Sequence, residues 1–381
     1  MSNRAGYYRT SFRGTESYLS FVPSLLPPKP DIEIDAEMID LLSKATTGLV
    51  ALENIHQRIP NRQLFTAAYV HKEALLSSQI EGTQATLEDI FDPMIETNTN
   101  YDIEEVINYL KAAQFAKDEL SRGLPLCNRL LKETHRILMT GVRGQDKRPG
   151  EFRNTQNLIG RRGATLKNAY YIPPNPRDML EAMYALENYI HEKDNTNHLI
   201  RAALIHYQFE TIHPFMDGNG RIGRMLIVLF LMSKEVLTTP ALYISYFLKK
   251  NQAEYYALLT KAREQGQYEQ WIKFFLKAIY ESAEDAVKTI DELTALHDKN
   301  VNVIQRLGRA RINIGRVFEY LQSHPIVDIG KTAQALNIAF NTAASAIKCL
   351  EELGILVQTT NARRNRVFLY KDYVEILKRG T

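Results

Sequence analysis

Apolar residues recur at three- and four-residue steps along most of this 381-residue chain, and that spacing is the strongest constraint on its fold. It places apolar side chains on one face of an α-helix. Strands and helices do not alternate, so no parallel sheet is expected and the main domain is predicted to be all-α. The pattern predicts helices from Ile34 to the Pro60-Asn61 break, from about Arg62 to Ile80, and over 101–120, 126–140, 176–191, 198–212, 220–233, 251–264 and 269–296.

Two segments depart from the helical pattern. Residues 157–159 and 169–172 flank a polar Gly-Arg-Arg-Gly loop and are rich in strand-forming side chains, which predicts one β-hairpin. Residues 1–33 carry several tyrosines and arginines and then the run Leu25-Leu26-Pro27-Pro28-Lys29-Pro30. Proline at that density opposes helix formation, so we expect an extended arm there.

The C-terminal segment has its own pattern and its own charge. Helical segments at about 310–323, 329–336 and 341–353 precede two short strands around a turn rich in Asn and Arg. Three helices with a two-stranded wing predict a small winged helix-turn-helix domain. Between Arg306 and Lys371 ten Lys/Arg stand against four Asp/Glu, although the whole chain carries only +3. This asymmetry indicates a separate partner for the module.

Two kinds of partner fit the C-terminal module. Arg363, Arg364 and Arg366 on the predicted wing would contact DNA phosphates, which makes a DNA-binding regulator the alternative function. A protein-binding or homodimer-forming winged helix fits equally well, because residues 341–348 are poor in side chains that read bases.

Composition favours a soluble protein of the cytoplasm. Cys127 and Cys349 cannot form a disulfide framework and are expected to be buried thiols in a reducing compartment. The longest apolar run, Met225 to Met232, is too short to cross a bilayer, and the first residues lack a hydrophobic signal core. A cytoplasmic location is therefore expected.

One loop between two predicted helices concentrates chemically useful residues. The segment from His213 to Arg224 reads His-Pro-Phe-Met-Asp-Gly-Asn-Gly-Arg-Ile-Gly-Arg. Its Gly218 to Gly223 portion matches G-x-G-x-x-G, but a helix precedes it and no strand with a terminal acidic residue follows. A dinucleotide-binding turn is therefore rejected.

The residue types in this loop suit a nucleotide's phosphates beside a group that must lose a proton. Glycines before a helix leave its first amides unpaired for phosphate oxygens. Arg221 and Arg224 lie three apart, so they are expected on one face, where guanidinium groups match phosphate geometry. Asp217 is a suitable Mg²⁺ ligand, and His213 can accept a proton at neutral pH. Each residue alone is most often structural, but together they supply different parts of one site.

The segment from His213 to Arg224 resembles the Fic-domain motif, H-x-F-x-D/E-G-N-G-R-x-x-R, at every specified position. The likeness continues through Arg148–Arg153 and Tyr171–Pro174 and covers roughly residues 60 to 270. It implies a Fic-type helical bundle with the hairpin as a flap that clamps the target by strand addition. It also implies a protein adenylyltransferase, which transfers AMP from ATP to a Ser, Thr or Tyr hydroxyl of a protein.

The resemblance assigns a role to each loop residue. His213 would be the catalytic base, Asp217 would hold Mg²⁺, and Arg221 and Arg224 would neutralise pyrophosphate charge. The ATP-binding set that it implies is Glu81, His213, Gly218, Asn219, Gly220, Arg221, Ile222, Gly223, Arg224 and Asn251, of which Asn251 lies on the nucleoside side.

A second motif predicts a restraint built into the chain. The segment from Ser77 to Gly82 resembles the family's inhibitory motif, Ser/Thr-x-x-x-Glu-Gly/Asn, and lies ahead of the catalytic loop. Glu81 would pair with Arg224 and misplace ATP. In some relatives the same carboxylate helps to remove AMP from targets, so both directions of reaction stay open, as does self-modification. The expected domains are an N-terminal arm with the inhibitory helix (1–100), the Fic core (101–297) and the winged helix (298–381).

Overall fold

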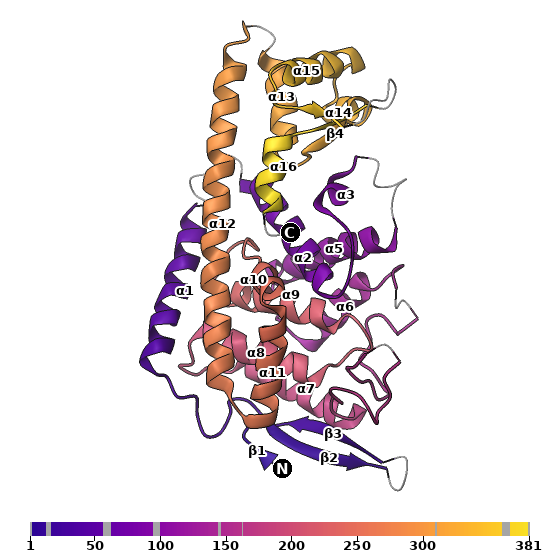
Figure 1. Cartoon of the computed structure of the whole chain (residues 1–381), viewed down its shortest axis with the longest axis vertical. Helices are drawn as coiled ribbons and strands as arrows, with labels where there is room; N and C mark the ends of the chain where they lie inside the picture. Colours follow the sequence, from indigo (N-terminus) through magenta and orange to yellow (C-terminus); the bar gives the residue numbers. More distant parts are fainter. Residues whose placement is uncertain are drawn as a thin grey trace.

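The molecule is elongated and mainly helical, which confirms the expected fold class. Figure 1 shows the long helix α12 (Tyr268–Gln305) running beside the other helices and continuing to the C-terminal module. No helix in the described part of the chain is both long and apolar enough to span a membrane. The computed structural model describes residues 2–12, 17–55, 62–93, 100–143, 146–161, 163–308, 311–359 and 366–379.

Most helices ahead of α12 follow the predicted ranges closely, and the short helices α3 and α10 were not predicted. Asn175 caps α7 through its side chain, and Pro176 occupies the first turn. The bounds are α1 (Ala36–Ile55), α2 (Arg62–Ile80), α3 (Leu87–Phe91), α5 (Tyr101–Ser121), α6 (Asn128–Leu138), α7 (Pro176–His191), α8 (His198–Ile212), α9 (Asn219–Ser233), α10 (Ser245–Lys250) and α11 (Gln252–Gln265).

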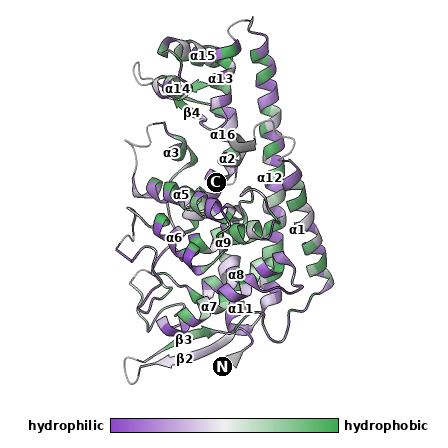
Figure 2. Ribbon diagram, turned by 180° about the vertical axis from the view of Figure 1, so that it is seen from behind, coloured by the Kyte–Doolittle hydropathy of each residue, from purple (hydrophilic) through white to green (hydrophobic). Residues whose placement is uncertain are grey.

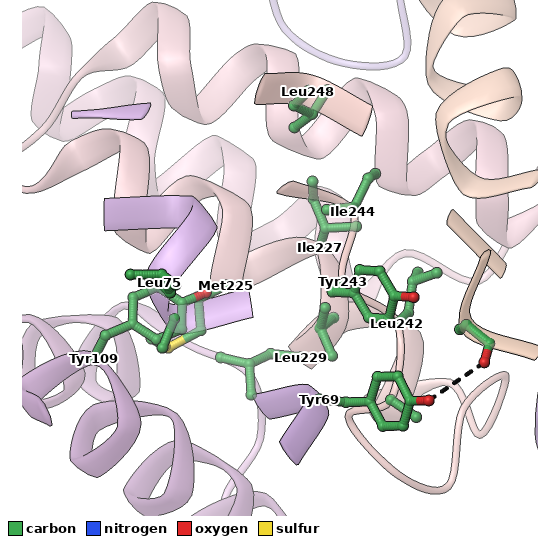
Figure 3. Close-up of a cluster of buried hydrophobic side chains, with 14 of the residues drawn as sticks. Tyr69, Leu75, Tyr109, Met225, Ile227, Leu229, Leu242, Tyr243, Ile244 and Leu248 are labelled. Carbon is green, nitrogen blue, oxygen red and sulfur yellow. Dashed lines mark hydrogen bonds between the residues drawn. The ribbon is translucent and has the colours of Figure 1, made fainter. Parts of the chain in front are cut away.

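Helices α8 and α9 form the centre of the core. Nearly every side chain of both is buried, which is the pattern of a helix covered on all sides. α8 packs against α7, α9 and α12, and α9 packs against α2, α5 and α6. Figure 3 shows Tyr69 and Leu75 of α2 in one apolar cluster with Tyr109 of α5 and Met225 of α9. The loop between α8 and α9 is therefore anchored at both ends in rigid structure.

Helix α12 is longer than predicted. In Figure 2 it alternates between hydrophobic and hydrophilic residues along its length, as expected of an amphipathic helix. It continues past residue 297, so the domain boundary expected there falls inside a helix. Ile304 is buried near its end, and the Asn300 amide donates to the Tyr370 hydroxyl at 2.7 Å. Contacts with the C-terminal module thus bury residues beyond 297.

The N-terminal arm folds as a sheet, which the sequence analysis did not predict. β1 (Ser2–Asn3), β2 (Gly6–Ser11) and β3 (Tyr18–Pro23) form an antiparallel sheet in that order. Tyr8 pairs with Phe21 in register, and their rings meet edge to face. The Phe21 N–H donates to the Ile172 carbonyl at 3.0 Å, so the sheet adjoins the segment expected to form the flap.

The hairpin expected at 157–172 is shorter than its sequence suggested. Its described residues form a single antiparallel bridge, between Ile159 and Tyr171. Ile159 donates to the Tyr171 carbonyl at 2.8 Å, and Tyr171 donates back at 3.0 Å. The Tyr171 hydroxyl donates to the Thr211 carbonyl at 2.6 Å, which ties the flap to the end of α8.

The C-terminal module contains the predicted helices and the two strands of the expected wing, with one more strand and one more helix. The sheet order is β4-β6-β5, antiparallel throughout. Arg363 and Arg364, expected on the wing, lie outside the described residues. The elements are α13 (Arg311–Leu321), β4 (Ile326–Asp328), α14 (Ile329–Leu336), α15 (Phe340–Glu352), β5 (Val357–Gln358), β6 (Val367–Leu369) and α16 (Lys371–Lys378).

Candidate active site

The loop between α8 and α9 begins with a left-handed residue. His213 has φ 50° and ψ 61°, and its N–H donates to the Phe209 carbonyl at 2.9 Å, which ends α8. The buried Arg153 guanidinium donates to the His213 carbonyl at 2.9 Å, and the Asn157 amide reaches the same oxygen at 3.2 Å. These donors satisfy a carbonyl that a helix end would otherwise leave unpaired.

Asn219 closes the loop on itself. Its side-chain oxygen accepts from the Phe215 N–H and its amide donates to the Phe215 carbonyl, both at 2.8 Å. Phe215 is fully buried and stacks on the His135 ring with centroids 3.7 Å apart. The Asn219 side chain therefore shapes the loop, and the unpaired backbone amides at the start of α9 are the groups that could receive an anion.

His135 of α6 is a member of the site that the sequence analysis missed. Its Nδ1 accepts the Gly150 N–H at 2.9 Å, which leaves Nε2 protonated to donate to the Asp217 carbonyl at 3.0 Å. Burial lowers the pKa of His135 to about 4, so the ring stays neutral and keeps this tautomer. His135 thus joins the Arg148–Arg153 segment to the loop.

The His213 imidazole is a neutral base in this setting. Burial, and next the nearby Arg153 charge, lower its pKa to about 4. Its Nδ1 lies 3.4 Å from the Glu210 carbonyl. An Nδ1–H facing that oxygen leaves the lone pair on Nε2, which is the atom that can accept a proton.

Arg221 is buried and faces a carboxylate from α5. Its Nη1 lies 3.7 Å from Glu105 Oε2, and its Nη2 lies 3.5 Å from Met139 Sδ. Glu105 also accepts from the Thr83 hydroxyl at 2.7 Å and from Arg143 Nε at 2.9 Å. The buried Nε and Nη1 groups of Arg221 make no hydrogen bond to any described residue, and the nearest anion to Nη1 is the Glu105 carboxylate.

Arg224 is held by helix α2. Its Nε donates to Ser77 Oγ at 2.9 Å, and its Nη2 donates to the Ser77 carbonyl at 2.8 Å and to Glu81 Oε1 at 2.7 Å. The Arg224 side chain is 1% exposed and the Glu81 side chain 36%. A Cβ at Gly220 would come within 2.2 Å of Glu81 Oε1, so the glycine makes room for this contact.

The remaining predicted ATP-binding residues lie around the loop rather than in it. Ile222 is buried in the core, and Gly223 faces α8, where a Cβ would come within 2.1 Å of Glu210 Oε1. Asn251 precedes α11, and its amide donates to the Phe247 carbonyl at 3.0 Å. The next residue, Gln252, donates to the Ile80 carbonyl at 3.2 Å, which brings this corner to the end of α2.

Asp217 fits one end of a magnesium site. Its Oδ1 accepts the Gly218 N–H at 2.7 Å, and its Oδ2 lies 3.4 Å from Lys147 Nζ. The carboxylate is 40% exposed. The described residues contain no cluster of three acidic, His or Cys side chains that could cage a metal. A single carboxylate still suits Mg²⁺, because that ion often takes one protein carboxylate, substrate phosphates and water.

Two stretches of the chain match models of known protein families. Residues 125–231 match the Fic/DOC family model and residues 39–118 match the model of the Fic/DOC family N-terminal region. Over these two stretches the chain is similar to the Fic/DOC family. The proteins named Protein adenylyltransferase Fic from Drosophila grimshawi and Drosophila melanogaster are 30% identical over 172 residues, which is 45% of this chain and 32% and 31% of theirs. The chain thus spans about a third of these relatives.

Solved structures show the same fold. A Fic family protein from Desulfovibrio desulfuricans superposes with a TM-score of 0.59 at 21% identity, over 90% of this chain and 98% of that one. A Fic domain containing signaling protein from Bacteroides thetaiotaomicron reaches 0.50 at 17% identity, over 66% and 97%. The first alignment leaves only a tenth of this chain uncovered.

We expect His135 to contribute strongly to the stability of the helical domain that carries the loop. Replacement by Leu leaves the Gly150 N–H and the Asp217 carbonyl without their partner, which should lower the free energy of unfolding by about 2 kcal/mol or more. His135→Gln, which keeps one donor and one acceptor, should lose less. Urea unfolding of both variants measures this. A loss below about 0.5 kcal/mol for His135→Leu would contradict the clamp.

Proposed function

We propose that the Fic domain of this chain is a protein adenylyltransferase that transfers AMP from ATP to a side-chain hydroxyl of a protein. The neutral His213, held next to a helix start with two buried arginines, is the observation that carries the proposal. The names of the Drosophila relatives support it.

The chemistry is a displacement at phosphorus. Nε2 of His213 takes the proton of a Ser, Thr or Tyr hydroxyl as that oxygen attacks the α-phosphorus of ATP. The bond from that phosphorus to the oxygen bridging to the β-phosphorus breaks, and pyrophosphate leaves. Amides at the start of α9 receive phosphate oxygens, and Arg221 and Arg224 offset the charge on pyrophosphate.

Asp217 and the phosphates of the nucleotide would hold Mg²⁺, which neutralises phosphate charge. Lys147, now 3.4 Å from the carboxylate, would be released from it. The clamp from His135 to the Asp217 carbonyl fixes the backbone that carries this ligand.

Glu81 restrains the reaction by occupying Arg224. A guanidinium bound to Ser77 and Glu81 has few donors left for a phosphate, so ATP sits out of line for attack. Removal of AMP from a modified protein is the second reaction this site supports, because Glu81 is a carboxylate able to orient water near the same phosphorus position.

Replacing Glu81 should release the enzyme. We expect Glu81→Gly to raise AMP incorporation, into the chain itself or into a target, on the order of tenfold, the effect of removing about 1.4 kcal/mol of restraint. Mass spectrometry after incubation with α-labelled ATP measures it. His213→Ala in the same background should abolish the gain.

The matched control is Gln84→Gly, which changes an exposed residue three positions after Glu81. It should leave AMP incorporation unchanged. A Glu81→Gly variant that binds ATP but transfers no more AMP than the parent chain would contradict the proposed restraint by Glu81. If neither Glu81→Gly nor Gln84→Gly transfers any nucleotide, the proposed transferase function itself is wrong.

The pH profile should report the lowered pKa of His213. Because the folded-state pKa is about 4, the imidazole is neutral and able to accept a proton throughout the range from pH 7 to 5. The value of kcat/KM for Glu81→Gly should therefore be nearly constant over that range and fall only as pH approaches 4. A fall with a midpoint near 6.5, the ordinary value for histidine, would contradict this environment.

We also propose that the C-terminal module is a winged helix, for which the order of α13, α14 and α15 with the sheet is the support. Its second helix of the turn, α15, exposes Phe340, Asn341 and Lys348. Binding of DNA would be electrostatic and would weaken steeply with salt.

A mobility-shift titration at several salt concentrations tests the DNA-binding alternative. If DNA is the partner, Arg363→Ala with Arg364→Ala should weaken binding and reduce the salt slope by about 2. An affinity that ignores both changes would favour the protein-binding or dimer-forming role instead.

A further inference from the structure

The inhibitory helix α2 has a second attachment, at the opposite side from the loop. Lys72 of α2 is fully buried, and its ammonium group donates to the Arg379 carbonyl at the end of α16 at 2.8 Å. A cation at a helix C-terminus is favourably placed, because the last carbonyls are unpaired and partly negative.

The surroundings of Lys72 make this contact specific. Its Nζ lies 4.7 Å from the Tyr243 ring centre, 5.4 Å from that of Tyr246 and 3.6 Å from Asp285 Oδ2. Tyr243 stacks on Tyr69 of α2, and Figure 3 shows the two rings together. An ammonium group enclosed by two aromatic rings depends on its few polar partners, one of which is supplied by α16.

The chain on the other side of the inhibitory motif contacts α16 as well. Lys378 of α16 forms an ion pair with Glu88 of α3, the short helix that follows Gly82, and α16 packs on α3. Arg379 forms an ion pair with Glu292 of α12. The end of α16 therefore joins the segments before and after Glu81 to the long helix.

Helix α2 is rigid enough to connect the two attachments. Between Lys72 and Glu81 the helix buries Glu73, which accepts from the Ser245 hydroxyl at 2.5 Å, and Ser77, which binds Arg224. The eight helical steps from Lys72 to Ile80, the residue before Glu81, span about 12 Å. A shift of α2 at Lys72 is therefore transmitted to Ser77 and Glu81 rather than absorbed between them.

We propose that α16 is a latch: by holding Lys72 and Glu88 it keeps α2 in the position from which Glu81 occupies Arg224. The C-terminal module then controls the Fic site, since a ligand that draws α16 from α2 frees the guanidinium for the phosphates of ATP. This inference rests on the proposed adenylyltransferase function and adds a regulatory input to it.

Lys72→Met tests the latch, because methionine keeps the apolar stem and removes the ammonium group. AMP incorporation from α-labelled ATP should rise about fivefold or more in the full chain. In the Glu81→Gly background the same substitution should add nothing further, since no inhibitory carboxylate is left to displace. The matched control is Lys273→Met. Lys273 is a mostly buried lysine of α12 that forms ion pairs with Asp35 and Glu37, away from α2.

A second variant tests the latch independently, in case Lys72→Met does not fold. Glu88→Gln with Lys378→Gln removes the partly exposed pair between α3 and α16 and should raise incorporation in the same direction. Hydrogen exchange of amides 69–81 should also accelerate in both variants. The latch is overturned if Glu81→Gly is active while neither variant exceeds the parent chain, or if they change activity equally with and without Glu81. An inactive Glu81→Gly would instead reject the proposed function.

Discussion

The arrangement of the site depends on one buried guanidinium. Arg224 is 1% exposed, and its donors are directed at Ser77 and Glu81 on a helix that precedes it by almost 150 residues. Leaving a buried charge without its partner costs about 3–5 kcal/mol. Arg224 therefore requires a polar or anionic partner in every state. In the described structure the segment of α2 and Glu81 provides it. Under the proposed function a nucleotide phosphate would replace that partner, and the ion pair would then act as a restraint.

The loop beside Arg224 is held by several hydrogen bonds, whereas the partner of Arg224, Glu81, is partly exposed. Asn219 ties the loop to itself, Arg153 and Asn157 hold the His213 carbonyl, and His135 holds the Asp217 carbonyl. The proposed base and the proposed metal ligand, fixed in this way, need no rearrangement for reaction, which is the condition for catalysis by positioning. In the proposed mechanism, control of activity falls on α2, which contacts Arg224 through Ser77 and the end of α16 through Lys72.

Local sequence patterns predicted most of the helices and the loop, because these depend on short-range spacing or on a contiguous motif. The pairing of Glu81 with Arg224 was expected only from the resemblance to a family motif, since the two residues lie far apart in the sequence. They did not predict His135 or Glu105, since these act through contacts with residues more than 80 positions away that no local pattern specifies. Asn219 was expected to bind phosphate, but its side chain makes hydrogen bonds to the Phe215 backbone instead. The boundary expected at 297 falls inside α12, because contacts with the C-terminal module bury residues of the helix beyond that position.

The most direct test of whether Glu81 and ATP compete for Arg224 is the position of the Arg224 side chain in crystal structures with ATP and Mg²⁺ bound. In the parent chain the Arg224 Nη2 should stay within hydrogen-bond distance of Glu81, with the terminal phosphate displaced from it. In Glu81→Gly the same nitrogen should contact a phosphate oxygen, and His213 Nε2 should face the α-phosphorus. A parent structure in which Arg224 binds both Glu81 and the terminal phosphate, with ATP in line for attack, would contradict the claim that the two partners exclude each other.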